Sequence, residues 1–171
     1  YKNALSINNN YPTAQNNLGQ ILFLKGEFNA SIDHLEWAVA LKPDFAEAHN
    51  NLGTALLGID KVQDAIIPYK KAASLKPDFA TAFNNLGIAY QRLGEFDLAI
   101  ENFQIAIDLI PGYATAHHNL SGVKTYTEND SQTIQMESLL ANNEITSQDR
   151  IYLSFALAKV NEDLGNHKEL F

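Results

Sequence analysis

The sequence contains no cysteine among its 171 residues. Disulfide bonds, a thiol nucleophile and cysteine-ligated metal are therefore excluded, and the redox compartment stays undecided, with the cytoplasm favoured. Basic residues are also scarce. Twelve Lys and Arg stand against 20 Asp and Glu, which gives a formal net charge of −8. Because nucleic-acid binding depends on clustered Lys and Arg, we expect no nucleic acid as a partner.

Long apolar runs and metal-binding spacings are missing as well. No apolar run approaches the roughly 18 to 20 residues that a membrane helix needs, so we expect no membrane partner. The five histidines show no HExxH or similar spacing, and the scattered carboxylates form no evident acid–base pair. We therefore expect no catalytic residue, no cofactor and no metal in this chain.

What the sequence does contain is a period of 34 residues. The residues that recur at this spacing are Pro43, Pro77 and Pro111, then Gly19, Gly53 and Gly87, then Ala38, Ala72 and Ala106. A fixed period of this length is typical of a stacked-repeat protein, in which each unit mainly contacts its neighbours. Such a protein offers a long surface, so the period favours a binding function.

The unit from 80 to 113 predicts a hairpin of two helices. Apolar residues recur at i, i+3, i+4 and i+7, the spacing of one helix face, at Phe83, Leu86, Gly87 and Tyr90. Gly94 suits the left-handed end of the first helix, and Pro111 ends the second. Since Gly87 costs a helix roughly 1 kcal/mol relative to Ala, we expect close approach of the second helix around Phe103.

These residues carry a family resemblance. Over residues 12–111, Leu-Gly is followed by an aromatic or aliphatic residue and then by Ala, an aromatic residue, Ala and Pro. This pattern resembles the tetratricopeptide repeat (TPR). Its Asn-Asn-Leu-Gly form most resembles the TPR region of O-linked N-acetylglucosamine transferases. The resemblance implies an all-α fold, a right-handed superhelical solenoid of TPR helical hairpins, whose concave wall is made by the first helices.

The period divides the chain into repeats and a tail. We expect residues 1–11 to be the tail of a preceding repeat, so that the array extends upstream. Three repeats are expected at 12–45, 46–79 and 80–113. After them we expect a partial fourth repeat, its first helix, at 114–127, an irregular helical linker at 128–150, and the start of a further TPR-like hairpin at 151–171.

The tail carries its own signals. A short helix over 134–140 is expected to be capped near Asp130 or Ser131, and Ser147 is a candidate cap for a longer helix over 150–164. From Lys124 onward the tail resembles the segment that joins TPR arrays to the catalytic domain in bacterial TPR-sulfotransferase proteins. That resemblance implies that the chain is a fragment, with the chemistry outside it.

The first helices also carry a polar stripe opposite their packed face. Asparagine is a poor helix former, and side-chain amides both donate and accept hydrogen bonds, which suits the backbone of an extended peptide. The alternative is that the amides bond neighbouring helices and stiffen the superhelix. We favour ligand contact by at least one Asn of each pair, best by Asn17, Asn51, Asn85 and Asn119. The candidate peptide-binding residues are Asn16, Asn17, Gln20, Asn50, Asn51, Thr54, Asn84, Asn85, Gln91, His118 and Asn119.

We therefore predict a protein-interaction module that binds a protein or peptide and belongs to a larger protein. The first alternative is the acceptor-recruiting region of a bacterial sulfotransferase or glycosyltransferase, and the second is a structural spacer or self-association module. A clamp for acidic chaperone C-termini would need several Lys and Arg on the concave face. Only Arg92 lies near it, so we reject that clamp. The sequence does not determine the oligomeric state.

Overall fold

The computed structural model describes residues 11–142 and 144–166, and in this part of the chain all regular secondary structure is α-helical. The prediction of an all-α fold is confirmed. The nine described helices are α2 Pro12–Leu24, α3 Phe28–Leu41, α4 Ala46–Gly58, α5 Val62–Leu75, α6 Ala80–Arg92, α7 Phe96–Leu109, α8 Ala114–Ser121, α9 Ser131–Ala141 and α10 Ser147–Asp163. The expected upstream tail, apart from Tyr11, and the last five residues of the expected final hairpin lie outside the described residues.

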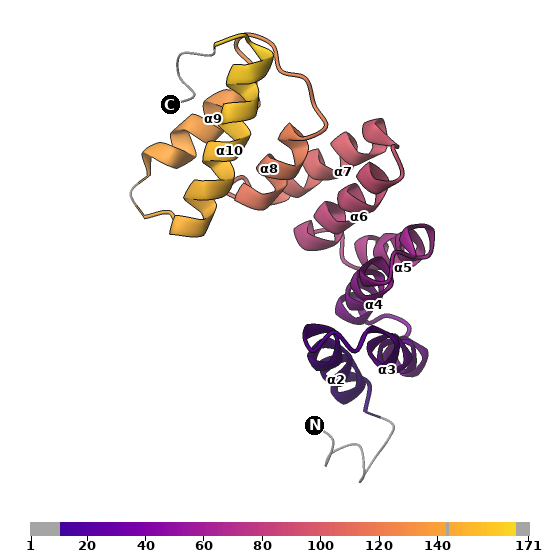
Figure 1. Ribbon diagram of the computed structural model, residues 1–171. Coiled ribbons are helices and arrows are strands. Elements are labelled where there is room, and N and C mark those ends of the chain that lie inside the picture. Colours follow the sequence, from indigo (N-terminus) through magenta and orange to yellow (C-terminus); the bar gives the residue numbers. More distant parts are fainter. Residues whose placement is uncertain (1–10, 143, 167–171) are drawn as a thin grey trace.

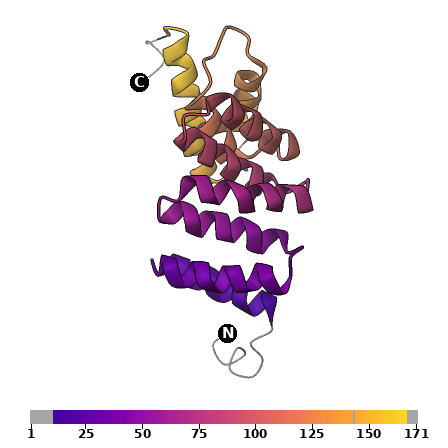
Figure 2. The ribbon, with the colours of Figure 1, turned by 90° about the vertical axis from the view of Figure 1, so that its right-hand side faces the viewer.

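The helices form a stack of hairpins. Helix α2 packs against α3, α4 against α5 and α6 against α7, and each second helix also packs against the first helix of the next pair. In Figure 1 the first helices α2, α4, α6 and α8 follow the inner side of a curve, and α3, α5 and α7 lie outside them. Figure 2 shows the hairpins lying across the long axis, one above another. The first helices therefore form the concave face, as the TPR resemblance implies.

The turns inside the hairpins follow from residues that tolerate left-handed backbone. Gly94 has φ +78° and directly follows Leu93, the C-cap of α6, so the predicted helix end is confirmed. In the second hairpin the corresponding residue is Asp60, which adopts φ 64°. Aspartate takes this conformation more readily than most residues do, because its short side chain bonds locally.

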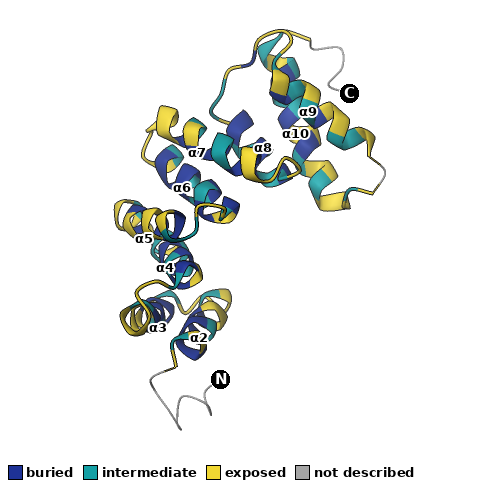
Figure 3. Cartoon of the chain, turned by 180° about the vertical axis from the view of Figure 1, so that it is seen from behind, coloured by how far each residue is buried: buried dark blue, intermediate teal, exposed yellow. Residues whose placement is uncertain are grey.

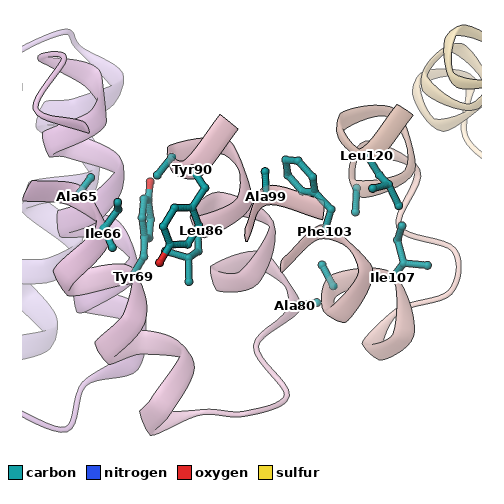
Figure 4. Packing of buried hydrophobic residues seen from close by; sticks show 13 residues of the cluster. Ala65, Ile66, Tyr69, Ala80, Leu86, Tyr90, Ala99, Phe103, Ile107 and Leu120 are labelled. Carbon is teal, nitrogen blue, oxygen red and sulfur yellow. The ribbon is translucent and has the colours of Figure 1, made fainter. Parts of the chain in front are cut away.

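One core cluster crosses from the second hairpin through the third to α8. A Cβ atom added at Gly87 would lie only 2.6 Å from ring atoms of Phe103, which confirms the close approach expected there. Figure 4 shows this cluster extending from Tyr69 on α5 through Leu86 on α6 to Leu120 on α8. Because each hairpin buries its apolar face against the next, the stability of the array comes mainly from contacts between neighbouring hairpins.

The tail replaces the second helix of a fourth repeat with α9 and α10. Helix α10 packs against both α8 and α9, over a separate core that includes Tyr126, Met136 and Leu153. The predicted cap of α9 is confirmed, because the Asp130 side chain accepts a hydrogen bond from the Gln132 backbone N–H. None of the described helices combines the length and apolar content that crossing a membrane requires.

The cap predicted for α10 is wrong by one residue. The Thr146 hydroxyl, not that of Ser147, accepts from the backbone N–H of Asp149 at 3.0 Å. Thr146 has the extended backbone of an N-cap, with φ −65° and ψ 155°, and Ser147 is already the first residue of the helix. Both hydroxyls are suitable caps, but Thr146 is the residue with N-cap backbone geometry.

Candidate functional site

The paired asparagines of the first helices connect each helix to the next. Each bond runs from the amide nitrogen of a second Asn to the amide oxygen of the first Asn in the preceding pair, 35 residues earlier. The three bonds are Asn51 to Asn16 at 2.8 Å, Asn85 to Asn50 at 3.0 Å and Asn119 to Asn84 at 2.9 Å. We call this series the asparagine ladder. The alternative prediction, that the amides bond neighbouring helices, is thereby confirmed.

Burial separates the two members of each pair. The first members, Asn16, Asn50 and Asn84, are only 5%, 7% and 3% exposed, so a ligand does not reach them while the ladder is intact. The second members are half-buried, and these are Asn17, Asn51, Asn85 and Asn119. The ladder uses one N–H of each donating amide, so its second N–H and its carbonyl oxygen can serve a ligand. Figure 3 shows buried, intermediate and exposed stretches along each of the helices.

A pocket of about 270 Å³ lies on the concave face between α2 and α4, with α3 behind it. It brings together three candidate residues from the sequence, Gln20, Asn51 and Thr54, and its wall is mostly apolar. The apolar residues that line it are Phe23, Leu24 and Leu35. Reasoning from the sequence missed these three. The sequence did carry a signal, because the next repeats have a glycine and an arginine at the position of Leu24, which the structure leaves 82% exposed.

The remaining candidates lie at the other end of the face. Gln91 is half-buried near the end of α8, where a Cβ at Gly122 would lie 3.5 Å from its amide nitrogen. His118 lies against α10 instead of in an open groove. Its ring centroid is 5.6 Å from that of Tyr152 and 6.2 Å from that of Phe155. The His118 ring is half-buried, and its contact with a ligand stays a prediction.

The few charges near the concave face are paired. Arg92 lies 2.7 Å from an Asp60 carboxylate oxygen and also donates to the Leu57 carbonyl. Glu47 lies 3.3 Å from the Lys76 ammonium, and a backbone hydrogen bond together with that ammonium lowers the pKa of Glu47. In the described part of the chain, no group of three or more His, Asp or Glu is placed to hold a metal ion. The face is therefore close to neutral.

A buried polar network fixes the tail to α8. His117 is fully buried, with Nε2 3.0 Å from the Pro111 carbonyl oxygen and Nδ1 3.2 Å from the amide nitrogen of Gln132. The Tyr126 hydroxyl donates to the amide oxygen of Gln132 at 2.8 Å. These contacts suit a neutral imidazole that donates through Nε2 and accepts through Nδ1. Burial accordingly lowers the pKa of His117.

Because His117 is buried as a neutral imidazole, we expect acid to lower the stability of α8–α10. Below pH 6.5 the unfolded chain binds a proton at His117 that the folded chain does not, so acid favours unfolding. We expect α8–α10 to have their full stability above pH 6.5, and to lose it as the pH falls toward the lowered pKa. Hydrogen exchange at pH 7.5 and pH 5.5, corrected for intrinsic rates, measures this. The same change in H117F would contradict the assignment.

Comparisons with known proteins identify the repeats. A family model described as TPR repeat matches residues 19–59 and 61–94, and one described as Tetratricopeptide repeat matches residues 80–113. Together they span more than half of the chain. A search of curated protein sequences finds no match.

Solved structures resemble the whole chain or its repeats. A crystal structure of MamA has 26% identity and a TM-score of 0.68, over 99% of this chain and 87% of that one. The second TPR domain of human RPAP3, in complex with an HSP70 peptide, has 26% identity and a TM-score of 0.63, over 68% of this chain and 100% of that one. The Arabidopsis OM64 TPR domain, at 20% identity and TM-score 0.64 over 66% and 93%, shares the fold.

Proposed function

The chain belongs to the tetratricopeptide repeat family, and on that basis we propose that its concave face binds an extended segment of a protein partner. Solenoids of this kind are interaction modules that use their concave surface. The observation that carries the proposal is the row of half-exposed amides, one on each of α2, α4, α6 and α8. In support, the RPAP3 domain is described with a bound HSP70 peptide.

The spacing of the amides suits an extended peptide. Packed helices lie about 8–10 Å apart, and an extended chain advances about 3.3–3.6 Å per residue. One amide therefore meets roughly every third residue of the ligand backbone. Contacts to the backbone do not depend on the ligand sequence, so selectivity must come from other residues on the face.

The charge of the face disfavours one class of ligand. The HSP peptides described with RPAP3 end in Glu-Glu-Val-Asp, and carboxylates of this kind are best bound by Arg and Lys. Here Arg92 is already paired with Asp60, and the chain carries a net charge of −8. We therefore propose a neutral or basic segment as the ligand.

The finer assignments rest on the sequence alone. The resemblances to O-linked N-acetylglucosamine transferases and to bacterial TPR-sulfotransferase proteins stay predictions, and none of the structures named above is described as a transferase. We also propose the repeat boundaries 12–45, 46–79 and 80–113. In their support, the first helices begin 34 residues apart, at Pro12, Ala46, Ala80 and Ala114.

The proposal is tested by removing the exposed amides. Peptides selected from a random display library against the wild-type protein serve as probes. The double variant N51A/N85A is expected to weaken their binding about tenfold, which corresponds to about 1.4 kcal/mol, or one to two hydrogen bonds. Fluorescence anisotropy measures the dissociation constant, and circular dichroism checks the fold.

The ladder supplies a matched control. The double variant N16A/N50A removes the same two ladder bonds from their buried side and leaves the exposed amides in place. Its affinity is expected to stay within about threefold of wild type, a change below 1 kcal/mol. Equal weakening in both double variants would mean that the amides act only by holding the helices together, and would contradict ligand contact.

A further inference from the structure

The first repeat differs from its neighbours at one packing position. The residues 34 apart at this position are Leu35, Tyr69 and Phe103, and all three are fully buried. Each packs onto the helix glycine of its own repeat. A Cβ at Gly19 would lie 2.6 Å from Leu35 Cγ, and one at Gly53 would lie 2.7 Å from Tyr69 ring atoms. The three side chains therefore occupy the same position beside the glycine, but the leucine side chain is shorter than the two aromatic rings.

The second repeat shows where the outer half of such a ring lies. The Tyr69 hydroxyl donates to the Thr54 hydroxyl oxygen at 3.2 Å, and the residue 34 positions before Thr54 is Gln20. The corresponding space in the first repeat therefore lies between Leu35 and Gln20. Both residues line the pocket of about 270 Å³ on the concave face. Figure 4 shows the Tyr69 and Phe103 rings that occupy the later repeats.

We propose that this pocket takes the side chain of a phenylalanine or tyrosine of the bound segment, an inference that rests on the proposed function. An apolar cavity of about 150 Å³ already holds a benzene ring, so 270 Å³ has room for one aromatic side chain. Phe23 and Leu24 supply apolar walls, and Gln20 stands where Thr54 meets the Tyr69 hydroxyl. Among the described residues, those that line the pocket carry no charge, which suits an uncharged ring.

The pocket also sets the position of the ligand on the ladder. Backbone contacts to the exposed amides repeat along the face, so by themselves they allow an extended peptide to shift from one amide to the next. Asn51 belongs both to the ladder and to the lining of the pocket. A ring in the pocket therefore fixes which ligand residue lies beside Asn51, and through it the register of the whole segment.

The test fills the pocket with the ring that the next repeat carries. We use p-cresol, the side chain of tyrosine, as the probe and follow the methyl signals of Leu24 and Leu35 by NMR. In the wild type, p-cresol is expected to shift both signals. In L35Y it is expected to leave the Leu24 signals unmoved, whereas the control L35M, which keeps a similar volume, should still respond.

A second variant keeps the test valid if L35Y does not fold. Leu24 is 82% exposed, so L24A removes a wall of the pocket without opening the core, and it is expected to weaken p-cresol binding at least threefold. A third readout uses the display-selected peptides. These should be enriched in Phe or Tyr and should lose at least tenfold in affinity for folded L35Y.

The outcomes separate this inference from the proposed function. If selected peptides bind wild type and L35Y equally and p-cresol moves neither methyl signal, the aromatic pocket is overturned, while peptide binding by the concave face stands. If p-cresol binds but no peptide is selected, the proposed function fails and the pocket remains as a site for a ring. If N51A/N85A leaves the peptide affinity unchanged, contact by the exposed amides is contradicted.

Discussion

Replacing Phe103 with alanine is expected to lower the free energy of unfolding by about 3–5 kcal/mol, the range for a buried aromatic side chain. Phe103 is fully buried, and its ring lies against the backbone of Gly87. It belongs to the cluster that joins α5, α6, α7 and α8, so the cavity weakens two repeats and the junction between them. Urea unfolding followed by circular dichroism gives the change.

The same helix offers a matched control. Phe96, the first residue of α7, is 54% exposed, so F96A removes the same ring from a site that is already half in water. Its cost is expected to stay below about 1 kcal/mol, because little apolar surface is lost and no cavity forms. Similar losses in F96A and F103A would contradict the view that packing against Gly87 holds the third repeat together.

Replacing Gln132 with alanine is expected to lower the stability of α8–α10 by about 2–4 kcal/mol. The amide of Gln132 is the partner of both His117 Nδ1 and the Tyr126 hydroxyl, and these three side chains are at most 4% exposed. Removing it leaves two buried polar groups unpaired, each at a cost of about 1–3 kcal/mol. Burial raises the pKa of Tyr126, so its hydroxyl keeps its proton and still needs an acceptor.

Hydrogen exchange resolved by residue measures where that loss falls. Protection should drop in α8, α9 and α10 and stay unchanged in α2–α4, because repeats contact only their neighbours. The control Q148A alters an exposed glutamine in the first turn of α10 and is expected to change stability by less than about 0.5 kcal/mol. Full protection of the tail in Q132A would mean that the network does not hold it.

The features that repeat in the sequence are those that could be predicted from it. The 34-residue period, the hairpins, the turn at Gly94 and the close approach of Phe103 to Gly87 all follow from local rules of helix ends and packing, and the structure bears them out. The cap at Asp130 also follows from a local rule. Each of these depends on residues close in sequence or at a fixed spacing.

The details of the site depend on contacts between repeats, which no single helix specifies. Asn50 and Asn51 are chemically identical neighbours, yet only Asn50 is buried, although each bonds to a first helix of an adjacent repeat. His118 was expected in the groove, and its ring packs beside Phe155 of α10, a contact that nothing in the local pattern specifies. Leu35 was visible as a departure from the aromatic residues at 69 and 103, but its pocket required the structure.

The asparagine ladder gives the array a mechanical property. Straightening the solenoid would lengthen its inner edge, where bonds of 2.8–3.0 Å connect the successive first helices. N–H···O bonds span only about 2.7–3.2 Å, so a junction that stretches by more than a few tenths of an ångström loses its bond. Under tension the junctions between repeats would then open one after another, and the protein would lengthen in steps.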